Sequence, residues 1–277
     1  MEIIFYRLLV LAIFFFGLAV GSFLNCVIYR LEAEKSFLKG RSFCPYCRRQ
    51  LQWYDLIPVF SYLFLRGRCR YCGKKISIQY PLVEMSAGIV FLLIFRFYQP
   101  FSLLNLISAQ ALSYLFLVLI FSLLIIIFVY DLKHYIIPDK IIYPAIAVVA
   151  LFNLQFVAAD NFSLFSLRGL FFKSLLAGAV GAAFFFALWF FSRGRWMGFG
   201  DVKLAFLIGF FLGPFKSFIA LFLAFFIGAV VGVVLIAAKR KTLKSQVPFG
   251  PFLVIGTFIA LLWGEPLSAL FLKLVSI

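Results

Sequence analysis

The chain has 277 residues, of which 65% are apolar and 20% are aromatic, with 40 Phe among them. A soluble domain has no use for so much apolar surface, so this composition predicts an all-α polytopic membrane protein. Lys and Arg number 26 against 10 Asp and Glu, which gives a formal net charge of +16. In a membrane protein this excess first reflects topology, because basic residues gather in cytoplasmic loops. No Arg-rich tail favours a nucleic-acid partner.

Apolar segments divide the chain into about eight predicted transmembrane helices. The first covers residues 4–28, and a polar stretch from Arg30 to Tyr80 follows it. The remaining apolar segments are 82–97, 103–130, 141–158, 168–192, 202–213, 216–237 and 248–264. The 202–213 segment is short for a membrane crossing, and Gly213 and Pro214 interrupt the chain at its end. It is therefore the least typical of the eight.

Two Cys-x-x-Cys knuckles lie in the polar stretch, Cys44-Pro-Tyr-Cys47 and Cys69-Arg-Tyr-Cys72, and Gly73 follows the second. Four thiolates at this spacing suit one tetrahedral zinc ion, because each knuckle presents two sulfurs. Four Cys ligands leave no open coordination position, so the predicted zinc is structural and would help a small module to fold. Gly73 suits a tight turn with φ > 0. Disulfides are the alternative, although a cytoplasmic loop is reducing.

The segments and knuckles together predict five parts in chain order. They are a first transmembrane helix, a cytoplasmic zinc-binding module, a second transmembrane helix, a membrane domain and a C-terminal tail, at residues 1–29, 30–81, 82–102, 103–265 and 266–277. Most of the Lys and Arg residues lie in the module and in the turns at 131–140, 193–203 and 239–244. With eight spans, these four loops share one face, which the positive-inside rule makes cytoplasmic. The N-terminus is then expected outside.

Two aspartates stand at the borders of apolar segments. Asp131 ends one segment, and Asp201 ends the motif Gly198-Phe-Gly200-Asp201 ahead of another. A carboxylate at a membrane edge is costly, so it indicates a functional site, and two at similar depth suggest an acid pair that shares one reaction. Helix capping is the alternative, and it is the simpler explanation for Asp139. It suits Asp131 poorly, because the macrodipole disfavours a negative charge where a helix ends.

An acid pair can hydrolyse an amide when one carboxylate is ionised and deprotonates water while the other is protonated and assists the carbonyl oxygen. Gly198 and Gly200 would permit close approach of a substrate backbone or unusual dihedral angles beside Asp201. The motif Pro248-Phe-Gly-Pro251 could hold irregular backbone that lines the same cavity. For both motifs, an ordinary break between helices is the alternative.

Two other classes of protein compete with an enzyme. One is a membrane transporter or channel with intramembrane aspartates and a zinc docking module. Against it, the apolar segments show no inverted repeat and few polar residues that could line a pathway. The other is a zinc-bearing membrane scaffold without chemistry, which leaves two acids at the membrane edge unexplained.

The order and identity of these motifs resemble the type IV prepilin peptidases from about residue 21 to residue 252. The motifs of the amino half are Gly21-Ser-Phe-Leu-Asn25-Cys-Val-Ile-Tyr-Arg30, the two knuckles, Trp53-Tyr-Asp55-Leu-Ile-Pro58, Arg66-Gly-Arg-Cys69 and Tyr80-Pro-Leu-Val-Glu84. Those of the peptidase half are Asp131, Ile137-Pro138-Asp139, Met197-Gly-Phe-Gly-Asp201-Val-Lys-Leu and Pro248-Phe-Gly-Pro251. Cys26, where an aliphatic residue is common, and the Lys-rich segment 239–244 are small departures from the family pattern.

The resemblance implies a membrane aspartyl endopeptidase that cleaves the leader of type IV prepilins and pseudopilins after a glycine at the cytoplasmic membrane face. Carried over to this chain, its catalytic pair is Asp131 and Asp201. The resemblance also implies N-methylation of the new N-terminus, a bacterial inner-membrane location and a role in type IV pili or type II secretion. S-adenosylmethionine follows from the resemblance alone, with no binding residues assigned, because the sequence has no nucleotide-binding glycine fingerprint. The expected partners are prepilins, pseudopilins and membrane lipids, and no nucleic acid.

Overall fold

The computed structural model describes residues 2–34, 40–98, 109–159, 169–242 and 245–275. The first residues of two predicted segments, 103–108 and 168, lie outside this part of the chain, as do the last two residues of the predicted tail. Within the described residues the chain is helical, with two isolated β-bridges and no strand. Helices are expected for such apolar runs, because a backbone in lipid must satisfy its own hydrogen bonds.

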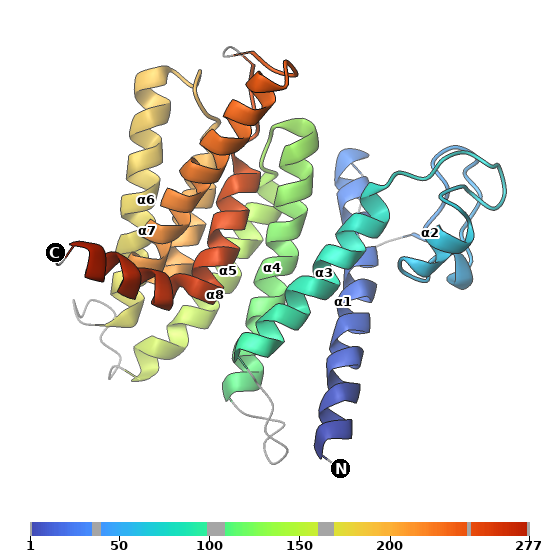
Figure 1. Ribbon diagram of the computed structural model, residues 1–277, viewed down its shortest axis with the longest axis horizontal. Helices are drawn as coiled ribbons and strands as arrows, with labels where there is room; N and C mark the ends of the chain where they lie inside the picture. The colour runs from blue at the N-terminus through green and yellow to red at the C-terminus, as the bar shows by residue number, and fades with distance from the viewer. Residues whose placement is uncertain (1, 35–39, 99–108, 160–168, 243–244, 276–277) are drawn as a thin grey trace. The chain divides into compact units, whose positions relative to one another are not determined.

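Figure 1 labels the helices in chain order. They are α1 (Glu2–Glu32), α2 (Phe60–Phe64), α3 (Gln79–Tyr98), α4 (Ala109–His134), α5 (Asp139–Ala159), α6 (Leu170–Ser192), α7 (Phe199–Ala237) and α8 (Gly250–Val275). A single 3-10 turn, Trp53–Asp55, precedes α2. The helix α8 continues through most of the segment predicted as a C-terminal tail and ends at Val275.

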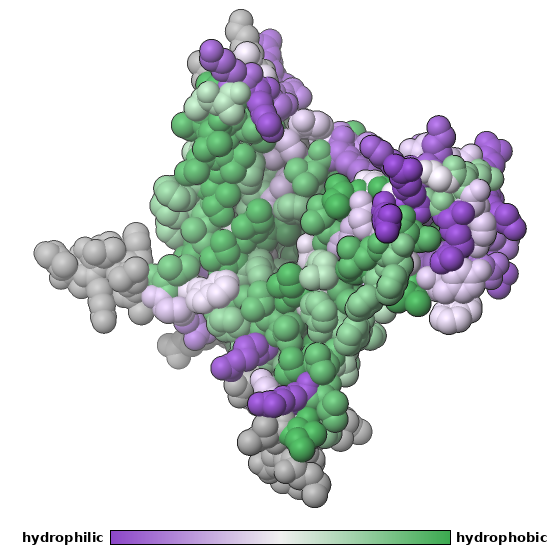
Figure 2. Space-filling view, turned by 45° about the vertical axis from the view of Figure 1, so that its right-hand side comes forward, coloured by the Kyte–Doolittle hydropathy of each residue, from purple (hydrophilic) through white to green (hydrophobic). Residues whose placement is uncertain are grey.

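Six of the described helices, α1, α3, α4, α6, α7 and α8, are long and apolar enough to cross a membrane. Hydrophobic residues cover much of the helical surface in Figure 2. Many hydrophilic residues lie at the right of that view, in the segment between α1 and α3. The chain is therefore an all-α, multi-pass membrane protein. The predicted count of eight spans is not confirmed, because α5 is not among the six and the predicted segments 202–213 and 216–237 both fall within α7.

The chain divides into two compact units, Met1–Ile126 and Ile127–Ile277, with the division inside α4. In the first unit, α1 and α3 run side by side (Figure 1). Small residues allow their close contact: a Cβ added to Gly17 would lie 2.7 Å from the Cα of Gly88. Such close backbone contact matters in lipid, where helices gain little from burying apolar side chains.

In the second unit, α7 packs against both α6 and α8. A Cβ added to Gly209 of α7 would lie 2.5 Å from the carbonyl oxygen of Ala177 on α6. Gly256 of α8 approaches the carbonyl oxygen of Ala220 on α7 in the same way. Both contacts therefore depend on the absence of a side chain.

The helix α7 is interrupted at Gly213, whose φ of 73° and ψ of −176° are not helical. Residues from both sides of Gly213 meet one glycine of α6: a Cβ added to Gly181 would lie 3.2 Å from the Ala205 oxygen and 3.9 Å from Leu221 Cδ1. A straight helix would place residues 205 and 221 about 24 Å apart along its axis. The chain therefore turns back at Gly213, where the sequence predicts a break.

The turn in α7 leaves one carbonyl group without its helical donor. Pro214 has no N–H, so the carbonyl of Phe210 cannot form the usual bond four residues along the chain. Asn153 of α5 replaces that donor, with its Nδ2 3.0 Å from the Phe210 oxygen. Because an unsatisfied carbonyl is costly in apolar surroundings, this side chain from α5 stabilises the turn.

We predict that Gly209→Ala lowers the midpoint of thermal unfolding, because the new methyl group would overlap the main chain at Ala177. Overpacking of this kind costs about 1–3 kcal/mol. Gly232→Ala is the matched control, since nothing lies within 4 Å of a Cβ added there, and alanine favours the helix. Thermal unfolding of both variants in detergent makes the comparison, and equal midpoints would contradict the packing of α6 on α7.

Candidate functional site

Asp131 and Asp201 lie at two helix ends in the second unit. Asp131 is in the last turn of α4, and Asp201 is the third residue of α7. Both are buried, with exposed fractions of 4% and 7%. Asp131 is bound by the start of α8, and α8 packs against α7, the helix that carries Asp201. The structure thus brings together the two acids that the sequence predicts as a pair.

The carboxylate of Asp131 is held by the first residue of α8. The amide N of Gly250 donates to Asp131 Oδ2 at 3.0 Å. A Cβ added to Gly250 would lie 2.6 Å from the same oxygen, so only glycine leaves room for the acid. The N-terminus of a helix stabilises a negative charge. The start of α8 therefore offsets the unfavourable dipole that Asp131 meets at the end of α4.

The carboxylate of Asp201 caps its own helix. Its Oδ2 accepts a hydrogen bond from the amide N of Gly198 at 3.1 Å, as an acid at the third helical position commonly does. Gly198 has an ordinary φ of −79°. Gly200 has a different role, since a Cβ there would lie 2.9 Å from Ile137 Cβ. Gly198 therefore holds Asp201 through its amide, and Gly200 leaves room for Ile137 in the loop before α5. Neither role requires a left-handed backbone.

Asp139 is the first residue of α5 and lies in a different environment. Its Oδ1 pairs with Lys203 Nζ at 2.6 Å, and its side chain is 59% exposed. The Lys203 ammonium also lies 5.0 Å from the centre of the Tyr143 ring. Asp139 is therefore exposed and forms an ion pair at the start of a helix, whereas Asp131 and Asp201 are buried.

The four predicted metal ligands come together in the first unit. The Sγ atoms of Cys44, Cys47, Cys69 and Cys72 all lie within 4.8 Å of one another. Cys44 Sγ and Cys72 Sγ, one from each knuckle, are 3.9 Å apart. Four Zn–S bonds of about 2.3 Å in a tetrahedron place the sulfurs roughly 3.8 Å apart. The cluster thus fits zinc, and each of the four cysteines is a free thiol rather than half of a disulfide.

The two knuckles share one backbone design. The amide of Arg48 donates to the Cys44 oxygen at 2.8 Å, and the amide of Gly73 donates to the Cys69 oxygen at 2.9 Å. Both donors have positive φ, 58° at Arg48 and 68° at Gly73. The turn predicted at Gly73 is confirmed, and the first knuckle makes the same turn without a glycine.

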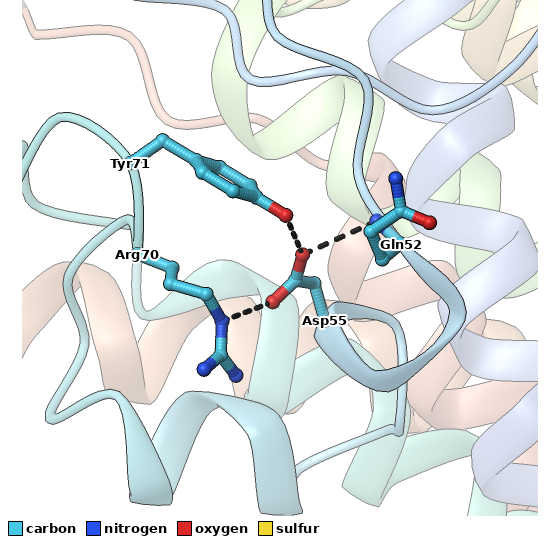
Figure 3. Close-up of polar contacts among 4 residues, drawn as sticks. All are labelled: Gln52, Asp55, Arg70 and Tyr71. Atoms are coloured by element: carbon cyan, nitrogen blue, oxygen red, sulfur yellow. Dashed lines mark hydrogen bonds and ion pairs between the residues drawn. The ribbon is translucent and has the colours of Figure 1, made fainter.

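Asp55 joins the 3-10 turn to the second knuckle, as Figure 3 shows. Its Oδ1 accepts from Arg70 Nε at 2.8 Å, and its Oδ2 accepts from the Tyr71 hydroxyl at 2.9 Å. The amide N of Gln52 donates to Oδ2 as well, at 3.2 Å. Arg70 and Tyr71 are the two residues between Cys69 and Cys72, so one carboxylate fixes the middle of the knuckle.

These contacts change the acidity of both partners. Burial alone would raise the pKa of Asp55, but the hydrogen bonds from Arg70, the Gln52 amide and Tyr71 outweigh it and lower the pKa below the ordinary value of 3.8. Burial and the hydrogen bond to Asp55 raise the pKa of Tyr71 to about 12. At neutral pH, Asp55 is therefore an anion and Tyr71 a neutral donor, which is the combination that their hydrogen bond needs.

The sequence motifs contain Asp55, Lys203 and Gly250, but they do not identify the contacts that these three residues make. Asp55 carries a signal, since it is the only acid in the strongly basic stretch from residue 40 to residue 80. Gly250 also carries one, because it stands between prolines at the start of a predicted helix, where an amide N–H is free to donate. Lys203 is one basic residue among many, and no local pattern marks its partner.

The observed features define a class of multi-pass helical membrane protein with a buried acid pair and a four-cysteine cluster. Two family models match the chain: the bacterial peptidase A24 N-terminal domain at residues 15–98 and the type IV leader peptidase family at residues 117–233. No solved structure matches it.

Several prepilin leader peptidase/N-methyltransferases are similar to the chain. The protein of Bacillus subtilis (strain 168) is 32% identical, over 95% of this chain and 97% of its own length. That of Aeromonas hydrophila is 30% identical, over 94% of this chain and 92% of its own. That of Myxococcus xanthus (strain DK1622) is 36% identical, over 72% of this chain and 55% of its own length. The chain belongs to the type IV leader peptidase family.

We predict that Asp55→Asn exposes the second knuckle to trypsin. Exposed ion pairs contribute little one by one, but three hydrogen bonds meet on this one carboxylate, so cleavage after Arg70 should become severalfold faster. Tyr71→Phe removes one donor and should have a smaller effect, while Lys75→Gln changes only an exposed side chain and should have none. Mass spectrometry of timed digests measures the rates. Equal cleavage of all three variants would contradict a stabilising role for Asp55.

Proposed function

We propose that this chain is a membrane aspartyl endopeptidase that removes the leader peptide of type IV prepilins and pseudopilins after a glycine. We further propose that it methylates the new N-terminus with S-adenosylmethionine. One observation carries the first proposal: Asp131 and Asp201 are buried at adjoining helix ends, and each is held by a glycine amide. The names of the relatives support both activities, and the family resemblance supplies the glycine and the methyl donor.

The acid pair would act through one water molecule. One carboxylate accepts a proton from the water, whose oxygen attacks the carbonyl carbon of the scissile amide, while the other carboxyl group donates a proton to the carbonyl oxygen. The resulting tetrahedral intermediate collapses when a proton returns to the amide nitrogen and the C–N bond breaks. Each acid uses its Oδ2 for a glycine amide, which leaves Oδ1 for water or substrate.

The two amides keep the acids in place and allow them to share one proton. Two like charges in a water-poor site cannot both ionise cheaply, so the pair favours one ionised and one neutral member. Both acids lie at a helix N-terminus, Asp131 at α8 and Asp201 at α7, so either can hold the negative charge. This suits a cycle in which the roles of base and acid alternate.

We predict that Asp131→Asn and Asp201→Asn each abolish cleavage of a pseudopilin, with a loss of at least about a thousandfold in rate. Asp139→Asn should retain most of the activity, because Asp139 is exposed and its ion pair with Lys203 contributes little. Product masses from the purified full chain in lipid vesicles measure the cleavage. A control uses pre-cleaved pseudopilin, which each variant should still methylate if it is folded.

Gly250→Ala extends the same experiment, because the new Cβ would displace Asp131. A displacement of about 1 Å can cost on the order of a hundredfold in rate, and Gly232→Ala is the matched control. Cleavage by all three aspartate variants would refute the aspartyl mechanism. Loss of cleavage in Asp139→Asn, with cleavage kept in Asp131→Asn, would move the assignment to Asp139.

We propose that the four-cysteine cluster holds a structural zinc ion. The ion would supply four Zn–S bonds that join the two knuckles, and with no free coordination position it would not act on substrate. The residues between the knuckles include few buried aliphatic side chains. Metal binding would therefore contribute much of the free energy that folds this module.

Elemental analysis should find about one zinc per chain, and Cys44→Ser or Cys72→Ser should lose it. The same variants should lose the resistance of residues 40–78 to trypsin, because the two knuckles would no longer be joined. Cys26→Ser is the control, since Cys26 belongs to α1 and lies outside the cluster. A disulfide within either knuckle, in protein purified without oxygen, would argue against the zinc site.

We propose a bacterial inner-membrane location with the zinc module and the acid pair facing the cytoplasm. The basic residues of the module support this orientation through the positive-inside rule. Prepilins or pseudopilins and membrane lipids are then the partners, and nucleic acid is not. The alternative of a transporter or channel is not favoured, since the family and its named relatives are peptidases.

A further inference from the structure

One segment outside the six candidate spans exposes many large apolar side chains. It covers residues 53–65, between the two knuckles, and contains the 3-10 turn and α2. The exposed fractions are 77% at Trp53, 62% at Leu63 and 84% at Phe64. The other exposed members are Tyr54, Leu56, Ile57 and Phe60. Large apolar side chains exposed in such number within one short segment indicate an interaction site.

The segment contacts a membrane helix. The ring of Phe60 stacks on the ring of Phe15 in α1, with centroids 6.5 Å apart and planes inclined by 22°. Phe15 belongs to the candidate membrane span of α1, Ile4–Glu32. The start of α2 therefore lies beside a part of α1 that is surrounded by lipid.

A buried acid of α3, Glu84, accepts a hydrogen bond from the backbone of the segment. The amide N of Val59 donates to Glu84 Oε2 of α3 at 2.7 Å. Glu84 is buried where α1 and α3 meet. A Cβ added to Gly21 of α1 would lie 2.6 Å from the Cα of Glu84. Non-helical backbone is tolerated at membrane depth where protein groups satisfy it. The contact also holds Val59 at a φ of 63°, an unfavourable angle for a β-branched residue.

Exposed cations lie within ten residues after the segment. They are Arg66, Arg68, Lys74 and Lys75, all on the surface of the module. Apolar residues with a basic border are typical of protein segments that lie in the plane of a membrane interface, where the cations meet anionic headgroups. Aromatic residues such as Trp53 are also enriched at this depth.

We propose that residues 53–65 form a membrane-interface anchor, which buries its apolar side chains among lipid acyl chains and its basic border among anionic headgroups. The occupant of this surface is the bilayer, because the segment is continuous with the lipid-facing surface of α1 through Phe60 and with α3 through Val59. The zinc module is therefore a peripheral membrane domain as well as an insert between two helices. This inference does not depend on the proposed catalytic activity.

The experiment measures tryptophan fluorescence of the full chain in vesicles of phosphatidylcholine and phosphatidylglycerol. In a Trp53→Phe background, a single tryptophan is introduced by Phe64→Trp or, as the control, by Tyr46→Trp. Tyr46 lies in the same module, in the first knuckle, and is 66% exposed. Subtracting the signal of the background protein isolates each probe from Trp189, Trp196 and Trp263.

The anchor predicts strong quenching of the position-64 probe by lipids brominated on the acyl chain, and protection of at least severalfold from aqueous acrylamide. The position-46 probe should behave in the opposite way. The native Trp53, measured as the difference between wild type and Trp53→Phe, gives a second readout that needs no change at position 64. It should also be quenched by brominated lipid.

Two results would overturn the anchor. Free access of acrylamide to position 64 and to Trp53, without quenching by brominated lipid, would place the segment in water. Protection that develops only after a pseudopilin is added would make the surface a substrate-docking site instead of a lipid anchor.

Discussion

A single hydrogen bond, from the amide of Gly250 to Asp131, solves the main electrostatic problem of the second unit. Asp131 closes α4, where the helix dipole disfavours a negative charge, and it is buried from water. The first turn of α8 faces that carboxylate and supplies both a donor and a favourable dipole. Because the donor must come so close, residue 250 has no room for a side chain.

The remaining contacts of this unit maintain the geometry of that bond. The helix α8 carries Gly250 and meets α7 where Gly256 lies on Ala220. The helix α7 carries Asp201 and meets α6 where Gly209 lies on Ala177. Both acids are therefore fixed by glycine contacts along helices. Small residues pack the helices and also position the chemistry, and a change in packing would move the site.

The sequence predicts well what is encoded locally. Apolar runs locate the helices, the two knuckles locate the four thiols, and Gly213 with Pro214 marks the break in α7. It predicts less well what depends on contacts between distant segments. Asp55 accepts from Arg70 and Tyr71, and Phe60 stacks on Phe15, because folding brings these residues together. The predicted number of spans is not confirmed for a similar reason. Hydropathy gives the apolar length of a segment, but it does not show how the chain turns back within α7.

The side chain of Asn153 has a consequence for where the acid of α7 is placed. Its amide binds the Phe210 oxygen, at the far end of the same half-helix that begins beside Asp201. This bond ties the half-helix to α5 at the end opposite Asp201. The position of this half-helix along α5, and with it the position of Asp201, therefore depends on a side chain that lies far from both acids in the sequence.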